Sequence, residues 1–374
     1  MDNPFKDILS NIKAFGKGSG DTALGVDIGS SSIKVVQIKK KDGKAVLVTY
    51  GMIGLGPYAE MDIGRVTNLS VDKIVEALNE TLKQSSTTTS SSAISMPVQS
   101  SLIFTVDLPL NVKKSDMPSV ISTEARRYIP VPITEVSLDW FILPKKETSF
   151  LEANSNGISP QEAKTEVLVV AIQNDAIARY RSIVDGCKLQ TDFFEIEVFS
   201  SIRSNFEHEL SLVLLIDFGA SRTKLSIVEF GTVKSFHIVG RGGADISDSI
   251  SKSFSIPFVE AEKMKKEYGL YGNPNDKNLA DIIKIHTDYI FSETNNVLLG
   301  YEKKYNRTIS KVILTGGGSL LKGIKEVAEN NFKAEVEIGR PFRKVVAPAF
   351  LDKVLESTGP EFAIAVGLAL RKLQ

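Results

Sequence analysis

The sequence of 374 residues has little cysteine and little histidine, and neither is arranged for covalent or metal chemistry. Its one cysteine, Cys187, excludes an intramolecular disulfide and a cysteine-based metal cage, and is typical of a reducing compartment. The three histidines, His208, His237 and His286, lack the spacing of a ligand set. We therefore expect no metal cage and a cytoplasmic location.

An excess of charge of one sign is missing as well. The chain has 45 basic and 45 acidic residues, whereas a dedicated nucleic-acid binder usually carries a basic surplus. The sequence also lacks an apolar run of the roughly 18 residues that a membrane-spanning helix needs, and it has no signal-peptide core. These absences predict a soluble protein without a nucleic-acid partner.

Two common nucleotide-binding motifs are absent, and an internal repeat stands in their place. Neither G-x-x-x-x-G-K-[S/T] nor a strand-turn-helix G-x-G-x-x-G occurs. Instead, LGVDIGSSSIK from Leu24 aligns with LLIDFGASRTK from Leu214, with Leu, Asp, Gly, Ser and Lys in register. The copies lie about half the chain apart, too far for a solenoid unit, so the repeat predicts a duplicated domain.

Each copy reads as an apolar strand, a glycine turn and a second strand. Successive backbone N–H groups in such a tip can bind phosphate oxygens, and Gly29 and Gly219 allow close approach of the backbone. Asp27 and Asp217 would then accept the waters of a magnesium ion. One copy alone could be an ordinary strand reversal, but the recurrence favours a pair of phosphate loops.

A third glycine cluster follows the apolar strand of residues 312–314. Its residues are Gly316, Gly317, Gly318 and Ser319, and we expect a helix to begin near Leu320. Here the backbone could lie flat against a base or ribose, and the helix N-terminus would offer N–H groups. The alternative is a tight strand-to-helix turn.

The pattern of apolar residues divides the chain into five segments. Residues 1–21 form a leader whose apolar stripe could pack on this protein, on a partner, or, through residues 3–16, on an anionic membrane. We expect the first lobe over 22–92, an inserted α+β subdomain over 93–194 and a return to the first lobe over 195–212. The second lobe spans 213–374, with its C-terminal helix returning towards the first.

Two local elements follow from composition within the first lobe. Apolar residues at helical spacing predict a helix over residues 71–84. The tract of residues 85–92 consists only of serine and threonine, so we expect it to be an exposed loop.

The order of the three glycine motifs resembles the phosphate-one, phosphate-two and adenosine motifs of the actin superfamily. Within it, four segments are similar to the type IV pilus assembly PilM family: LGVDIGSSSIKVVQI from Leu24, VISTEARRYIPVPI from Val120, GRGGADISDSI from Gly240 and GPEFAIAVGLALR from Gly359. The resemblance implies an α/β, actin-like (ribonuclease H-like) ATPase fold. Two similar lobes would enclose a nucleotide cleft, with an inserted subdomain as in the cell-division protein FtsA.

The resemblance also implies roles for individual residues toward ATP or ADP and Mg²⁺. The phosphates would be held by Gly29, Ser30, Ser31, Ser32 and Lys34, faced by Gly219, Ala220 and Ser221. Asp27 and Asp217 would organise the magnesium waters. Gly242 and Gly243 would approach the nucleotide, Glu262 and Lys265 would flank ribose and adenine, and Glu197 would position an attacking water.

The second loop departs from many active relatives, which have a further glycine where this chain has Ala220. Arg222 could reach the γ-phosphate, or it could be exposed or salt-bridged. ATP binding is therefore the expectation, and weak ATPase activity is left open.

For function, the resemblance implies an ATP-binding scaffold at the cytoplasmic face of the inner membrane. It would bind the N-terminal cytoplasmic tail of the membrane protein PilN, in a groove between the first lobe and the insert, and other proteins of the pilus platform. Two alternatives are a membrane-associated, filament-forming FtsA-like protein and a small-molecule kinase.

Overall fold

The computed structural model describes residues 21–374 apart from 111, 114, 144–163, 208–210 and 275–277, so the predicted leader helix lies outside the described residues. Of these residues, Val98–Arg179 form one compact unit, and those up to Pro97 and from Tyr180 onward form the other. In the described part of the chain, no helix combines the length and apolarity needed to cross a bilayer.

The larger unit begins with a five-stranded sheet, the first lobe. Its order is β3-β2-β1-β4-β8, with β1, β2 and β3 antiparallel and β4 and β8 parallel to β1. Asp42 and Gly43 both have positive φ angles, of 50° and 73°, which is the turn that a two-residue hairpin requires. The strands are β1 (Thr22–Ile28), β2 (Ser32–Lys41), β3 (Lys44–Gly54), β4 (Ser91–Met96) and β8 (Gln190–Ile196).

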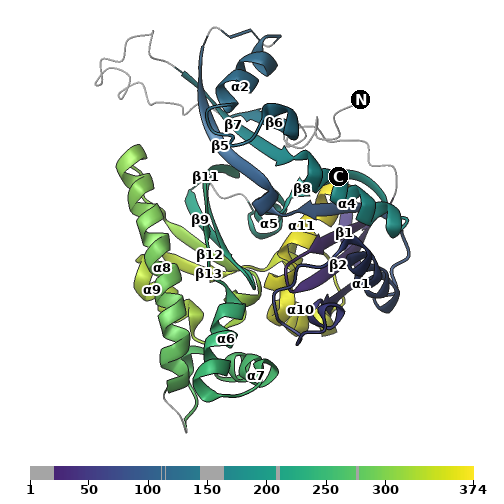
Figure 1. Cartoon of the computed structure of the whole chain (residues 1–374), viewed down its shortest axis with the longest axis vertical. Helices are drawn as coiled ribbons and strands as arrows, with labels where there is room; N and C mark the ends of the chain where they lie inside the picture. The colour runs from purple at the N-terminus through teal and green to yellow at the C-terminus, as the bar shows by residue number, and fades with distance from the viewer. Residues whose placement is uncertain (1–20, 111, 114, 144–163, 208–210, 275–277) are drawn as a thin grey trace. The chain divides into compact units, whose positions relative to one another are not determined.

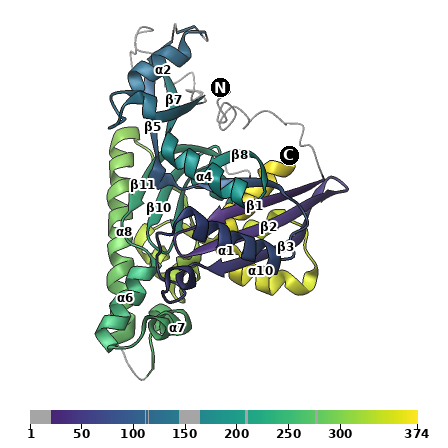
Figure 2. The same cartoon turned by 45° about the vertical axis from the view of Figure 1, so that its right-hand side comes forward.

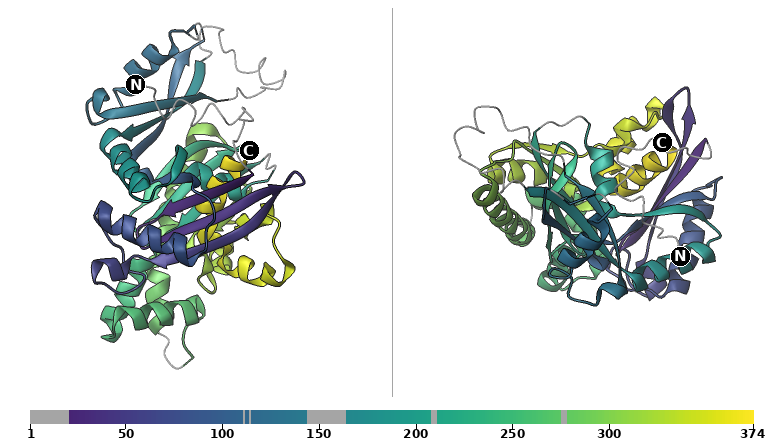
Figure 3. Two further views of the ribbon diagram at one scale, coloured as in Figure 1. Left: turned by 90° about the vertical axis from the view of Figure 1, so that its right-hand side faces the viewer. Right: turned by 90° about the horizontal axis from the view of Figure 1, so that it is seen from above.

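Helices cover both faces of this sheet (Figures 2 and 3). On one face, α1 (Val71–Gln84) has the predicted bounds and buries Ile74 and Leu78. On the other, α11 (Ala363–Leu373) packs against β1 and against α5 (Glu197–Asn205). A Cβ built on Gly25 would lie 2.0 Å from the carbonyl oxygen of Ala365, so this helix and β1 are in backbone contact.

The second lobe repeats the topology of the first. Its sheet has the order β11-β10-β9-β12-β13, again with three antiparallel strands followed by two parallel ones. Asp27 is opposite Lys34 in β1–β2, and Asp217 is opposite Lys224 in β9–β10. The strands are β9 (Leu212–Phe218), β10 (Thr223–Glu229), β11 (Thr232–Val239), β12 (Lys311–Thr315) and β13 (Glu335–Ile338). Matching order and register confirm the duplication expected from the repeat.

The helices of the second lobe bury its apolar core. α8 runs beside the sheet (Figure 1), and its Ile283, Ile290 and Phe291 are fully buried with Ile216 and Phe218 of β9. The helices are α6 (Gly243–Phe254), α7 (Phe258–Tyr268), α8 (Asn278–Tyr305) and α9 (Ile324–Phe332). α10 (Asp352–Thr358) instead buries Leu355 in the apolar cluster of β1, β2 and α11.

The smaller unit is an α+β module. Its antiparallel sheet has the order β5-β7-β6, with β5 (Ser101–Pro109), β6 (Val136–Ile142) and β7 (Lys164–Gln173). Apolar residues of α2 (Met117–Ala125) share a core with this sheet. α4 (Asn174–Gly186) follows β7 directly, and its residues from Tyr180 onward belong to the larger unit.

The compact module is smaller than the predicted insert of residues 93–194. β4 and β8, which the prediction placed in the insert, belong to the first-lobe sheet, where β4 pairs with β1 and β8 pairs with β4. The prediction of an exposed loop over residues 85–92 is wrong at both ends. Ser85 and Ser92 are buried, and Ser92 lies in β4, where its hydroxyl is 2.8 Å from that of Thr191. A paired strand can bury serine when its hydroxyl finds a partner.

A buried carboxylate joins β8, α5 and α11. Glu195 is fully buried and accepts hydrogen bonds from Ser200, from Arg203 (2.6 and 2.7 Å) and from Arg371 (2.5 Å). Burial by itself raises the pKa of Glu195, but Arg203 and Arg371 outweigh burial and lower it to about 2. The ion pair therefore contributes stability above the ordinary pKa of 4.5, and this contribution is lost as pH falls from 4.5 to about 2.

Replacing Glu195 with glutamine is expected to lower the free energy of unfolding by about 3 kcal/mol at pH 7, because two guanidinium groups that are only 21% and 10% exposed lose their buried counter-charge. Urea unfolding at pH 7 and pH 3 measures the effect, and the difference between the two proteins should shrink at pH 3. Glu76→Gln, in an exposed ion pair with Lys73, is the matched control and should leave stability unchanged. An E195Q penalty that is equal at both pH values would contradict this account.

Candidate functional site

The turns of the two repeat copies have the same geometry. Gly29 N donates to Ser32 O at 3.0 Å, and Gly219 N donates to Arg222 O at 3.1 Å. A Cβ built on either glycine would lie within 3.0 Å of that same carbonyl oxygen, so a side chain would crowd both turns. The tips Gly29–Ser32 and Gly219–Ser221 are partly exposed, and Arg222 is exposed. Both loops are therefore accessible to a ligand.

The first loop is held in place by the first lobe. Ser30 O accepts from the backbone N–H and the hydroxyl of Thr67, at 2.9 and 3.2 Å, and Ser31 O accepts from Leu55 N at 2.8 Å. These carbonyl groups are satisfied within the protein, as a loop that offers N–H groups to an anion requires. Lys34 extends along the loop, where its Nζ donates to Ser32 Oγ at 2.8 Å.

The structure brings three acidic side chains from different segments together around Lys224. The Lys224 Nζ donates to Glu197 Oε2 at 2.6 Å and to Asp217 Oδ2 at 3.1 Å. Asp27 is buried and accepts from Ser95 Oγ at 2.9 Å. Burial raises the pKa of Asp27, and the charges of Lys34 and Lys224 oppose that rise. Glu197, predicted to position water, is thus held in an ion pair with the second lobe.

The first turn of α6 supports the second loop. Gly243 N donates to Gly219 O and Ala244 N to Ala220 O, both at 2.9 Å, while Gly242 N donates to Asp245 Oδ2 at 2.8 Å. A Cβ built on Gly242 would lie 2.4 Å from Ala220 O. Because their N–H groups are used within the protein, Gly242 and Gly243 position the loop instead of donating to a ligand.

Glu262 and Lys265 lie on α7 beside this turn. The Lys265 Nζ donates to Gly243 O at 2.8 Å and to Glu262 Oε2 at 2.6 Å, and Ser247 Oγ donates to the same carboxylate at 2.5 Å. Burial lowers the pKa of Lys265, although the negative charge of Glu262 acts to raise it. Glu262 and Lys265, the residues predicted to flank ribose and adenine, are therefore bonded to α6, the helix whose first turn supports the second loop.

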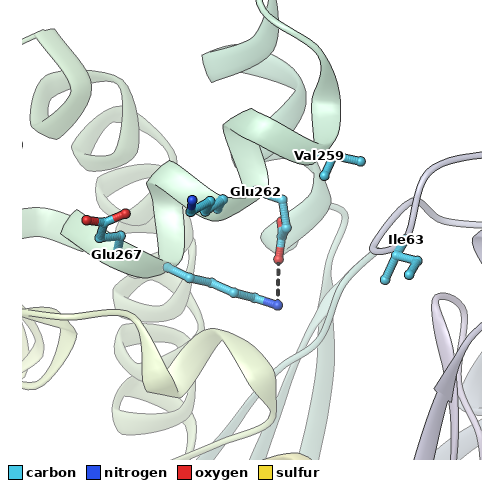
Figure 4. Close-up of a pocket in the computed structure, with 6 residues that line it drawn as sticks. Ile63, Val259, Glu262 and Glu267 are labelled. Carbon is cyan, nitrogen blue, oxygen red and sulfur yellow. Dashed lines mark ion pairs between the residues drawn. The ribbon is translucent and has the colours of Figure 1, made fainter.

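An open groove of about 560 Å³ lies on the other side of Glu262, between α7 and Ile63 of the first lobe (Figure 4). In the groove, Lys266 Nζ is 3.2 Å from Glu262 Oε1. The residues that line it are Ile63, Val259, Glu262, Lys263, Lys266 and Glu267.

The two lobes also meet near this groove through Arg65, which the sequence did not single out. Its Nη1 is 3.1 Å from Asp248 Oδ1 of α6. Its guanidinium lies 4.2 Å from the ring centre of Phe258, the first residue of α7. No motif surrounds Arg65, so only the fold reveals this contact.

The third glycine cluster lies against the strand of the second loop. Thr315 of β12 is opposite Asp217 of β9. Gly316 has a φ of +79°, and a Cβ built there would lie 2.4 Å from Asp217 Oδ1. A Cβ on Gly318 would lie 2.3 Å from the ring of Phe218, and Ser319 Oγ donates back to Gly316 O at 2.7 Å. The cluster is thus packed against the end of β9 and has no room for side chains at these positions.

The helix predicted to begin near Leu320 begins later. A 3₁₀ turn covers Gly317–Leu320, and α9 begins at Ile324 after Gly323, whose φ is +82°. Gly317 faces Glu361, whose Oε1 would be 2.9 Å from a built Cβ. The N–H groups available near the cluster therefore belong to the 3₁₀ turn and not to the N-terminus of α9.

The magnesium ion expected beside Asp27 and Asp217 does not fit the residues present. A cation within reach of Asp217 would meet the ammonium of Lys224, which already bonds that carboxylate, and two cations so close repel each other in a buried site. No group of three or more His, Cys, Asp or Glu side chains among the described residues could hold a metal ion. Lys224 aligns with Lys34 in the internal repeat, and this alignment is the sequence signal that could have identified Lys224 as a site residue.

Comparisons with known proteins agree with this architecture. A model of the family described as type IV pilus assembly protein PilM matches residues 25–373. The chain is 24% identical to cell division protein FtsA of Buchnera aphidicola subsp. Baizongia pistaciae, covering 88% of this chain and 86% of that protein. FtsA of Neisseria meningitidis serogroup B is 23% identical, with 92% and 88% covered.

Solved structures share the fold. A PilM-PilN type IV pilus biogenesis complex superposes with a TM-score of 0.77, 23% identity and coverage of 94% of this chain and 98% of that chain. The ethanolamine utilization protein EutJ from Carboxydothermus hydrogenoformans gives 0.55, with 14% identity and 99% of each chain covered. MreB 5 of Spiroplasma citri bound to AMPPNP gives a TM-score of 0.50 at 10% identity, and the match covers 92% of this chain and 94% of that chain. The fold is that of actin-like ATPases, as expected.

Proposed function

We propose, from the premise that this chain belongs to the type IV pilus assembly protein PilM family, that it is an ATP- and ADP-binding scaffold of the pilus assembly platform. We place it at the cytoplasmic face of the inner membrane, held there through its partners. The observation that carries the nucleotide part is the pair of similarly folded glycine turns, each flanked by an Asp opposite a Lys. In the second copy, Asp217 and the first-lobe Glu197 both bond to Lys224.

In this proposal each motif has one task toward the nucleotide. The N–H groups of Gly29–Ser32 and Gly219–Ser221 bind the phosphates, and Lys34 and Lys224 supply positive charge. The backbone of Gly316–Ser319, in which Gly316 and Gly318 leave no room for a side chain, lies against the ribose or base. Glu262 and Lys265 complete the site from α7. Binding, orientation and charge neutralisation are thus assigned to this chain's own residues.

The proposed partner is the N-terminal cytoplasmic tail of a PilN-type membrane protein, since the solved relative is a PilM-PilN complex. Nucleotide would regulate this binding by favouring one closure of the lobes over another. The contacts Lys224–Glu197 and Arg65–Asp248 join the lobes, so a ligand between the loops would change the same contacts that set the closure. Other platform proteins would assemble on the complex.

Calorimetric titration of the full-length protein with ATP, ADP and a PilN tail peptide tests the proposal. We expect nucleotide binding, and tail affinity that differs by at least about threefold, roughly 0.65 kcal/mol, between ADP, a non-hydrolysable ATP analogue and no nucleotide. A protein that binds neither nucleotide contradicts the whole proposal. Equal tail affinity in all three states removes the coupling and leaves the scaffold role.

The second candidate is an FtsA-like filament protein, favoured by the similarity to FtsA over most of the chain. Sedimentation with ATP and anionic liposomes separates the two, using the full chain and a variant without residues 1–20. Pelleting with ATP that is lost in the truncated variant would favour the filament protein over the scaffold.

A further inference from the structure

Lys224 is placed differently from its repeat partner Lys34, although both follow a phosphate loop in the same register. Lys34 Nζ reaches along its own loop to Ser32 Oγ at 2.8 Å. Lys224 Nζ instead reaches out of its lobe to Glu197 of α5, at 2.6 Å, while it also contacts Asp217 at 3.1 Å. Only the second lysine therefore joins acidic groups from both lobes.

The Lys224 ammonium is largely buried between two carboxylates. Its side chain is 12% exposed, and those of Glu197 and Asp217 are 10% and 12% exposed. Its Nζ donates to a carboxylate of each lobe, Glu197 Oε2 at 2.6 Å and Asp217 Oδ2 at 3.1 Å.

The ammonium lies beside Asp217, the carboxylate that was expected to accept the waters of a magnesium ion. It lies at the end of β9, beside the second phosphate loop and within reach of both Asp217 and the charge of Asp27. A magnesium ion prefers to keep several waters and demands near-octahedral geometry, which needs space beside Asp217 that the lysine fills. Strand pairing of Lys224 with Asp217 fixes the base of the side chain there.

We propose that the Lys224 ammonium replaces the divalent cation in this site, so that the protein binds ATP and ADP without Mg²⁺. The inference rests on the proposed nucleotide binding and specifies its chemistry. The ligand class is a nucleoside di- or triphosphate in its metal-free form, whose phosphate charge is balanced by Lys224 from the second lobe and by Lys34 from the first.

Isothermal titration of the full-length protein with ADP and a non-hydrolysable ATP analogue, with Mg²⁺ or with EDTA, tests the inference. We expect the native dissociation constants in the two buffers to agree within about twofold, less than 0.5 kcal/mol. Lys224→Met keeps the length of the side chain and removes its charge. It should bind at least about tenfold more weakly in EDTA and recover with Mg²⁺, a change of about 1.4 kcal/mol.

Lys34→Met is the matched control from the other repeat copy. It should weaken binding in both buffers while the ratio between them stays near one. Lys224→Arg keeps the charge, so its nucleotide binding should stay insensitive to Mg²⁺. Thermal melts show whether K224M folds, and K224R replaces it as the test if K224M does not.

Native binding that falls tenfold or more in EDTA would overturn the inference and leave the nucleotide proposal intact. An equal buffer ratio for K224M and the native protein would also overturn it. No nucleotide binding in either buffer would instead contradict the proposed function itself.

Discussion

Replacing Gly367 with alanine is expected to lower the free energy of unfolding by about 3 kcal/mol or more, at the upper end for overpacking a core. A Cβ built there would lie 1.9 Å from the carbonyl oxygen of Ser200 in α5. α11 cannot move away from α5, because its other side touches β1, where Gly25 is in backbone contact with Ala365. The added methyl group must therefore displace a helix or a strand of the first lobe.

Urea unfolding followed by circular dichroism measures this effect. Gly300→Ala in α8 is the matched control, since no atom lies within 4 Å of a Cβ built at that position. This helical position is open, so the G300A protein should be about 0.5–1 kcal/mol more stable to unfolding, because alanine loses less backbone entropy than glycine on folding. A G367A protein whose stability stays within 1 kcal/mol, roughly, of the native value would show that α11 is not packed as described.

Replacing Gly242 with alanine is expected to weaken nucleotide binding at least tenfold, roughly 1.4 kcal/mol, which is the largest effect that we expect from one methyl group at the site. The added Cβ would lie 2.4 Å from Ala220 O and 2.7 Å from Gly219 O. Both oxygens belong to the loop that we propose to bind phosphate, and both accept hydrogen bonds from the first turn of α6. The loop must move, and binding groups tolerate displacements of only about 0.5 Å.

Gly240→Ala is the matched control two residues away, because nothing lies within 4 Å of a Cβ built there. Fluorescent-nucleotide titration of the two variants should give a native dissociation constant for G240A and a raised one for G242A. Thermal melts show whether G242A is folded when its affinity is measured. A folded G242A protein with native affinity would mean that the second loop does not bind the nucleotide.

Much of the architecture was predictable because it depends on local sequence. The repeat predicted two lobes with matching strands, and the structure has the same strand order and the same Asp-Lys register in both. α1 has the predicted bounds because its apolar spacing is regular and Ser70 caps it. The comparisons confirm the PilM family and the actin-like fold.

Errors arose where composition and tertiary context disagree. Serine and threonine suggested that residues 85–92 form a loop, yet Ser92 belongs to a strand whose neighbours come from β1 and β8. The expected helix at Leu320 is delayed to Ile324, since Gly323 adopts a left-handed conformation between the 3₁₀ turn and α9. In both cases the deciding feature, a strand partner or a backbone angle, does not show in the local composition.

By itself the sequence determined the duplicated strand-turn-strand units and their glycines, because backbone conformation at a tight turn depends on the few residues that form it. Only the tertiary structure decided what their equivalent lysines contact. Lys34 stays with Ser32, whereas Lys224 pairs with Glu197 of the other lobe. The partner of a side chain is set by long-range packing, which brings residues together that no local spacing relates, and so two equal positions of a repeat acquire different chemistry.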